Sequence, residues 1–423
     1  MVALRGWLQA VLLLAVILVP LDGLAHTDPR RLSPTPRQLA YIDDAGAVRL
    51  VNADGANGRL LIAPERCPKA RELLWSPAGD AIACLGEGEQ RMDGYGFWRG
   101  SALIVDLQGR VVREMTRINR FSWSPAGRHV AYGVVTAVPT VTRPYTTYTH
   151  YIAEVSGRVV ARLDNVAGYL VWSPNGGAVA YTAGTGEVLI HWIAQGRQQR
   201  LSPGVAGILG WVLDGKALLV AAHFRGGDLA CADDFEASLL SLASGKMVRV
   251  PQLDDSAQFW VAPDGARAAF LFGFARGRTA DADLHVLDFR SLKAVPVKGS
   301  VIRYPSEAIP PAYVTMSADG TRIYWASFDG ERPTIYRAPE SGTKPVRLAQ
   351  IPGFSLAFSP DLAKLAYAVE GSPPALATTN LDGSDVRRVG SLGGRPTGFD
   401  TPFAWRPPAA KLTTHRSDWR GCP

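Results

Sequence analysis

The sequence predicts an all-β fold, a single propeller of four-stranded antiparallel blades closed into a ring. Three observations predict it. An aromatic-Ser-Pro-x-Gly mark recurs along the chain, its copies are about 47 residues apart, and 43 Gly and 30 Pro among 423 residues supply frequent turns. That spacing is typical of a four-stranded propeller blade. Eight blades are favoured and seven are the alternative.

The mark explains where each innermost strand lies. Its clearest copies start at Trp75, Trp123 and Trp172. Weaker copies start at Trp211, Trp260, Met316, Phe358 and Trp405. The aromatic is expected to wedge between neighbouring sheets, Pro to end ladder donation, and Gly to accept a left-handed turn. The apolar run that follows is then the next strand of the blade, covered on both faces.

Four short β-like runs fill each interval, for example residues 121–124, 129–132, 151–155 and 159–163. The chain enters mid-repeat at Leu39 and ends with an inner strand at 403–406. We therefore expect the two terminal segments to complete one blade and leave no open edge. Leu362 and Ala409 replace the turn Gly in the last two copies, which keeps seven blades as the alternative.

The first 25 residues read as a secretory signal peptide. Arg5 precedes an apolar run over 8–21, and Ala25 ends a small-residue cleavage site. We predict cleavage after Ala25, a lead over 26–35, the propeller over 36–412 and a tail over 413–423. The mature chain is expected in the periplasm or secreted, without a membrane span. Its net charge of +7 comes from scattered residues, so a nucleic-acid partner is not expected.

Export makes disulfides plausible for the four cysteines. Cys67 precedes an inner strand and Cys84 ends the next strand, so Cys67–Cys84 is the favoured bridge. Cys231 and Cys422 would then pair or stay free, and Cys67–Cys422 is the main rival. No Cys-x-x-Cys spacing supports a zinc or redox site.

The repeat resembles the TolB-type propeller repeat, a WD-like repeat of exported bacterial proteins. Its signature Trp-Ser-Pro-Asp-Gly is followed by a strand that ends near Asn-x-Asp-Gly, matched here at 52–55 and 380–383. The resemblance spans residues 36–412 and implies the fold rather than an activity. We expect neither an N-terminal α/β domain like that of TolB nor a hydrolase domain in this chain.

Long insertions fall on one side of the predicted meander. With strands a to d counted outward, the b–c and d–a links share one face, and they hold the segments 86–100, 134–149, 223–236, 272–283 and 298–312. Function on rigid scaffolds concentrates in such loops, and Tyr, Trp and Arg anchor interfaces. The candidates for the binding face are Arg91, Tyr95, Trp98, Arg99, Arg143, Tyr145, Tyr148, Arg303 and Tyr304.

These features favour a non-catalytic exported propeller that binds an envelope protein, or a polysaccharide or peptide, through its loop-rich face. No catalytic residue, metal ligand or cofactor is predicted. The alternative is a propeller enzyme, a polysaccharide lyase or a hydrolase of the peptidase type, with its site in the central funnel. Oligogalacturonate lyases have a similar repeat and gather His from several blades. The seven His of this chain form no His-x-x-x-His pair.

Overall fold

A computed structural model of the chain describes most of residues 37–407. The described ranges are 37–86, 100–137, 147–202, 205, 207–224, 235–254, 259–262, 265–272, 282–303, 313–329, 332–342, 344–393 and 402–407. The predicted signal peptide, the lead, the tail, Cys231 and Cys422 lie outside these ranges. Within them, no helix has the length and apolar character that crossing a membrane requires.

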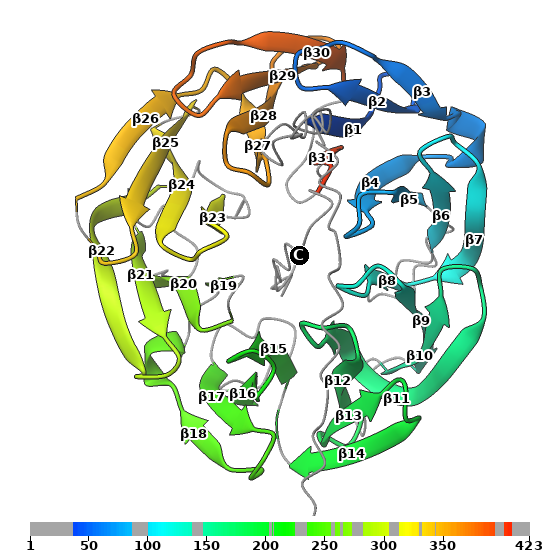
Figure 1. Ribbon diagram of the computed structural model, residues 1–423, viewed down its shortest axis with the longest axis vertical. Coiled ribbons are helices and arrows are strands. Elements are labelled where there is room, and N and C mark those ends of the chain that lie inside the picture. Colours follow the sequence, from blue (N-terminus) through cyan, green and yellow to red (C-terminus); the bar gives the residue numbers. More distant parts are fainter. Residues whose placement is uncertain are drawn as a thin grey trace, which may run out of the picture. The chain divides into compact units, whose positions relative to one another are not determined.

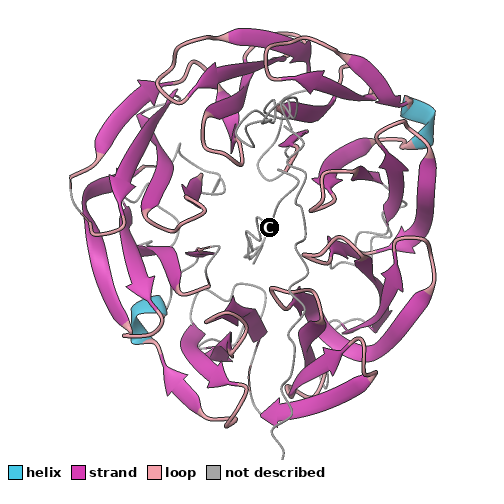
Figure 2. Cartoon of the chain, in the orientation of Figure 1, coloured by secondary structure: helices cyan, strands magenta, loops and turns pink. Residues whose placement is uncertain are grey.

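Antiparallel four-stranded meanders follow one another around a ring (Figure 1). Within the described ranges, strands supply nearly all of the regular structure, and the helical content is two short 3-10 turns, Pro64–Arg66 and Pro251–Leu253 (Figure 2). We number the blades I to VIII in chain order, with blade VIII built from both ends of the described chain. The prediction of an all-β propeller with eight blades is confirmed.

The blades have the following strands, each written from the ring centre outward. Blade I holds β4 (Ala70–Trp75), β5 (Ala81–Gly86), β6 (Gly100–Asp106) and β7 (Val111–Ile118). Blades II and III hold β8 (Arg120–Trp123), β9 (His129–Ala137), β10 (Thr147–Glu154), β11 (Val159–Trp172), β12 (Ala178–Ala183), β13 (Val188–Trp192) and β14 (Arg197–Ser202). Blade IV holds β15 (Gly207–Val212), β16 (Ala217–Phe224), β17 (Phe235–Ser241) and β18 (Met247–Arg249).

The second half of the ring follows the same plan. Blade V holds β19 (Phe259–Val261), β20 (Arg267–Phe272), β21 (Ala282–Asp288) and β22 (Lys293–Ile302). Blade VI holds β23 (Val314–Met316), β24 (Arg322–Asp329), β25 (Arg332–Pro339) and β26 (Val346–Gln350). Blade VII holds β27 (Phe354–Phe358), β28 (Lys364–Val369), β29 (Ala375–Asn380) and β30 (Arg387–Ser391).

Blade VIII closes the ring as expected. Its inner strand β31 (Phe403–Trp405) pairs antiparallel with β1 (Gln38–Ile42), which pairs with β2 (Val48–Asn52) and then β3 (Arg59–Ile62). Leu39 lies opposite Trp405, and Tyr41 opposite Phe403. The C-terminal and N-terminal segments thus share one sheet, and β31 covers the edge of β1 that would otherwise be unpaired.

Blades II and III are fused into one seven-stranded sheet, which the sequence analysis did not predict. Strand β11 is 14 residues long. Its first half pairs with β10 as the outer strand of blade II, and its second half pairs with β12 as the inner strand of blade III. The expected run at 159–163 is therefore the first part of a longer strand, because β-pairing resumes after Asn165 instead of ending there. The expected run at 151–155 falls largely in β10, which begins earlier, at Thr147.

Five tryptophans of the repeat mark each join their own blade to the one before it. The Trp123 indole N–H donates to the Leu74 carbonyl at 3.1 Å, and that of Trp405 donates to the Ala357 carbonyl at 2.8 Å. The indole N–H groups of Trp75 and Trp211 likewise donate to the Ala404 and Val171 carbonyls, and that of Trp172 donates to the Ser122 hydroxyl. The aromatic therefore fills space between inner strands and also satisfies its own buried donor.

The Ser and Gly of the mark build the turn between the first two strands of a blade. The Ser124 hydroxyl accepts from the His129 amide at 3.0 Å, and Gly127 has φ of 69°. Ser359 makes the same bond to the Lys364 amide at 2.8 Å. Leu362 occupies the glycine position there with φ of 54°, so this turn survives with a side chain in the left-handed region.

The core lies between neighbouring blades. Leu365 and Tyr367 of blade VII, for example, pack against Ala326 and Ile335 of blade VI and are fully buried. The outermost strands, in contrast, each carry at least one Arg or Lys, such as Arg59 on β3. Charged side chains on exposed strand edges oppose pairing with other chains.

A disulfide joins Cys67 to Cys84, the pair that the sequence analysis favoured over Cys67–Cys422. Cys67 lies in the link that leaves blade VIII, and Cys84 lies on β5 of blade I. Both side chains are buried. The bridge therefore fastens the closing blade to its neighbour.

Candidate functional site

The strand boundaries place the long connections on one face of the blades. In an antiparallel meander, the b–c and d–a links emerge at the same end of the strands. The segments between β5 and β6, β9 and β10, β16 and β17, and β20 and β21 are all b–c links. The link between β22 and β23 is of the d–a type. We call this end the loop-rich face and the opposite end the turn face.

Most of the predicted binding residues lie outside the described residues. These are Arg91, Tyr95, Trp98, Arg99, Arg143, Tyr145 and Tyr304. Arg303 follows β22, and its amide donates to the Ser327 hydroxyl at 3.1 Å. Tyr148 was expected in a loop but lies in strand β10 and is only 3% exposed. Its ring is therefore part of the blade interior rather than an exposed anchor.

Tyr148 belongs to a cluster of side chains at the inner rim of the loop-rich face. We call it the Arg120 cluster, and its members are Arg120, Tyr148, His150 and Tyr169. The Arg120 guanidinium donates to the Tyr169 hydroxyl at 2.5 Å and to the Tyr148 hydroxyl at 3.2 Å. Its Cζ lies 3.9 Å from the Tyr169 ring centroid and 5.3 Å from that of Tyr148. Arg120 begins the inner strand β8, and Tyr169 lies near the start of the inner part of β11.

Gly133 makes room for this cluster. It lies opposite Arg120 on one side and opposite His150 on the other. A Cβ at this position would meet the His150 ring atoms Cε1 and Nε2 at 2.9 Å and the Arg120 Cβ at 3.3 Å. His150 is 2% exposed and packs edge-on against Tyr148, with ring centroids 5.7 Å apart. Glycine is thus required here for close approach rather than for a turn.

The electrostatics of the cluster favour an anionic or aromatic group from outside. Among the described residues, the Arg120 guanidinium has no ion pair, and its Nε–H is buried without a hydrogen-bond acceptor. Two tyrosine rings compensate the charge through cation–π contact. Tyr169 is 41% exposed, so its ring can be covered by a ligand. A guanidinium held in this way is ready to receive a carboxylate with little loss of side-chain entropy.

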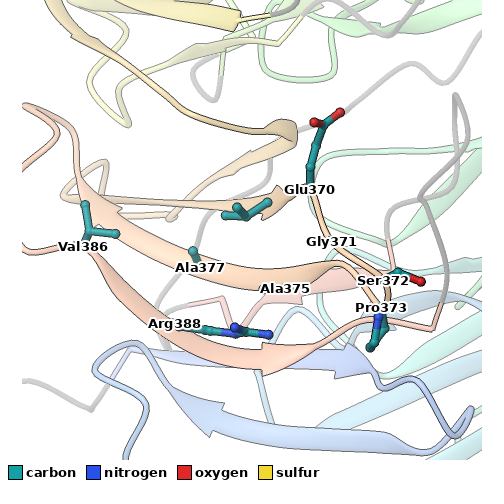
Figure 3. A pocket seen from close by; sticks show the side chains of 9 residues that line it. Glu370, Gly371, Ser372, Pro373, Ala375, Ala377, Val386 and Arg388 are labelled. Atoms are coloured by element: carbon teal, nitrogen blue, oxygen red, sulfur yellow. The ribbon is translucent and has the colours of Figure 1, made fainter.

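A separate pocket lies on blade VII (Figure 3). It has a volume of about 380 Å³, and Val369, Ala375 and Ala377 form an apolar wall. Arg388 also lines it, whereas the Glu370 carboxylate points away from the Arg388 side chain (Figure 3). The pocket reaches the b–c link 370–374. Because its wall is mostly apolar, the pocket has few polar groups that could orient a ligand.

The titratable groups of the described ranges include histidines with shifted pKa values. No three His, Cys, Asp or Glu side chains gather there as ligands for a metal ion. Burial lowers the pKa of His191, and burial likewise lowers that of His285, although Asp283 partly opposes the shift. Both imidazoles are on the middle strands of their blades, apart from one another.

Arg120, His150 and Tyr169 were not among the residues predicted from the sequence. Arg120 begins β8, and His150 and Tyr169 lie within β10 and β11, outside the long insertions from which the candidates were chosen. One signal was available: Gly133 interrupts an apolar strand with no turn nearby, a position typical of close approach.

Comparison with known proteins supports the fold. Neither a protein-family model nor a curated protein matches the chain. Among solved structures, it is similar to one described as the eukaryotic initiation factor, with TM-score 0.54 and 14% identity over 89% of this chain and 99% of that chain. It is similar to dihydro-heme d1 dehydrogenase NirN in complex with DHE, with TM-score 0.55 and 14% identity over 88% and 76%.

TolB from Acinetobacter baumannii is also similar, at 18% identity over 76% of this chain and 82% of that chain, but with a TM-score of 0.33. At such identities the comparisons show the β-propeller fold alone, because unrelated functions share one fold. This chain is a β-propeller protein.

Proposed function

We propose that this chain is an exported, TolB-type binding propeller whose loop-rich face holds a macromolecular partner of the bacterial envelope. The Arg120 cluster carries the proposal, because a preorganised guanidinium lies beside an exposed tyrosine at the inner rim. Tyr and Arg are the residue types that dominate binding energy in interfaces. The signal-peptide pattern and the resemblance of the repeat support export.

The preferred partner is a protein or peptide that presents a carboxylate to Arg120 and an apolar surface to Tyr169. The loop residues predicted from the sequence, among them Trp98 and Tyr145, are proposed as further contacts with this partner. Such an arrangement needs no cofactor and no catalytic group, since affinity comes from burial and charge pairing.

Recovery of the partner from an envelope extract tests the proposal, with the chain lacking residues 1–25 as bait. We expect Arg120→Lys and Tyr169→Ala each to reduce recovery at least about tenfold, because Lys cannot make the planar double contact. Arg113→Lys is the matched control, since Arg113 also lies over a tyrosine ring, that of Tyr132, at 5.2 Å but on an outer strand.

Equal recovery with all three variants would contradict the proposal. Thermal unfolding of each variant must first show an intact fold. Turnover of a polyuronate or a peptide by the purified protein would favour the enzymatic alternative instead.

A further inference from the structure

The turn face of blade VI holds a second pocket, which lies at the opposite end of the strands from the Arg120 cluster. Its volume is about 340 Å³. It is lined by Thr321, Arg322, Arg337, Ala338, Pro339, Lys344 and Val346. Three of these seven residues are cations, and they come from three separate segments of the blade.

The strand register explains why these cations gather. Tyr324 of β24 lies opposite Arg337 of β25, so Arg322, two residues earlier, projects on the same side as Arg337. Arg337 in turn lies opposite Val346 of β26, and Lys344 leads into that strand. The sheet therefore fixes the two arginines as diagonal neighbours along one side.

The neighbouring carboxylates do not neutralise the three cations. Glu340 forms an ion pair with Arg267 of blade V instead. Asp319 stays ionised but accepts its hydrogen bonds from the Ser317 hydroxyl and from the Thr321 amide and hydroxyl, which lower its pKa to about 2. Within the described part of the chain, the side chains of Arg322, Arg337 and Lys344 make no ion pair or hydrogen bond with another residue. A positive excess is left in the pocket.

We propose that this pocket binds a compact, doubly charged oxyanion: inorganic phosphate or the phosphate monoester end of a larger molecule. Two guanidinium groups and one ammonium supply donors for several phosphate oxygens, and arginine matches phosphate geometry. Binding would also relieve the repulsion between like charges held close together by the sheet. The site is independent of the function proposed for the loop-rich face.

Titration calorimetry with inorganic phosphate, at ionic strength held constant with chloride, tests the proposal on the chain lacking residues 1–25. We expect one phosphate per chain, and about tenfold weaker binding to Arg337→Gln because one charge-assisted contact is lost. Arg347→Gln is the matched control: it removes the same charge from exposed Arg347 on β26, which does not line the pocket. It should bind phosphate as the unmodified chain does.

Absence of saturable binding to the unmodified chain would overturn the proposal, as would equal affinity of Arg337→Gln and Arg347→Gln for phosphate. A second titration with glucose 6-phosphate, against glucose, distinguishes the two sources of the anion. Tighter binding of the ester than of phosphate assigns the site to a larger phosphorylated molecule, and tighter binding of phosphate assigns it to the free ion. Circular dichroism checks that each variant is folded.

Discussion

Blade VIII and the fused pair of blades II and III are held in the ring in opposite ways. Blade VIII joins distant parts of the chain, and its inner strand β31 has only three residues. Blades II and III share the continuous strand β11, so no link separates them. Blade VIII is therefore held by backbone pairing between β31 and β1, by side chains packed against blade VII and by a disulfide toward blade I, whereas an uninterrupted strand joins blades II and III.

The proposed binding site lies on the fused sheet and not on blade VIII. Arg120, Tyr148 and Tyr169 all lie on the fused sheet. A site on regular, connected strands keeps its geometry better than one on loops. Three variants test how far the two regions differ, beginning with the largest expected effect.

Replacing Trp405 with Ala should destabilise the chain most. The side chain is 8% exposed, fills the seam between blades VII and VIII and donates to the Ala357 carbonyl. Large-to-small changes of buried Trp cost about 3–5 kcal/mol. Urea unfolding followed by circular dichroism measures the loss. Trp405→Phe should cost less, since it keeps most of the burial, and equal losses from both variants would refute the role of packing at this seam.

Removing the disulfide by Cys67→Ala with Cys84→Ala should have the next largest effect, about 2–4 kcal/mol, because the bridge restricts the unfolded chain. Both positions are buried within the cluster between blades VIII and I. Comparing urea unfolding of the double variant with that of the parent chain, oxidised and reduced, gives the contribution. If the disulfide does not stabilise the junction of blades VIII and I, the urea midpoint of the double variant will equal that of the oxidised parent, and reduction will not change the midpoint of the parent.

Gly133→Ala tests the fused pair. The added Cβ would clash with the His150 ring, and overpacking of this kind costs about 1–3 kcal/mol. Partner recovery should fall as well, because Arg120 is the other group that the Cβ would approach. Gly157→Ala is the control for backbone strain without a clash. A Cβ on Gly157 would have no heavy atom within 4 Å, so only the φ of 121° opposes the change. If Gly133→Ala recovers as much partner as the parent chain, the Arg120 cluster does not take part in binding.

The sequence predicted the ring because its signals are local and repeated. The Trp-Ser-Pro-x-Gly marks at Trp75, Trp123 and Trp172 each specify an inner strand and the turn after it, whatever the rest of the chain does. The continuity of β11 was not predictable in the same way. Asp164 and Asn165 read as a strand end, yet Asn165 takes a left-handed φ of 56° inside the strand and the pairing resumes.

Sites that depend on register could not be predicted from local signals. Arg322 and Arg337 meet only because β24 and β25 pair as they do, and a shift by one residue would send one of them to the other side of the sheet. Arg120 and Tyr169 come from neighbouring blades, so their contact depends on how the blades pack. The candidate loop residues were chosen by composition, which says nothing of convergence.

The bonds between inner strands give the molecule its own optical reporters. Each of Trp75, Trp123, Trp172, Trp211 and Trp405 has its indole shared between two consecutive blades. Opening one junction would move a single chromophore into water and leave the others dry. In a chain whose only tryptophan is one of these five, a shift of the emission spectrum would therefore report the opening of that one junction.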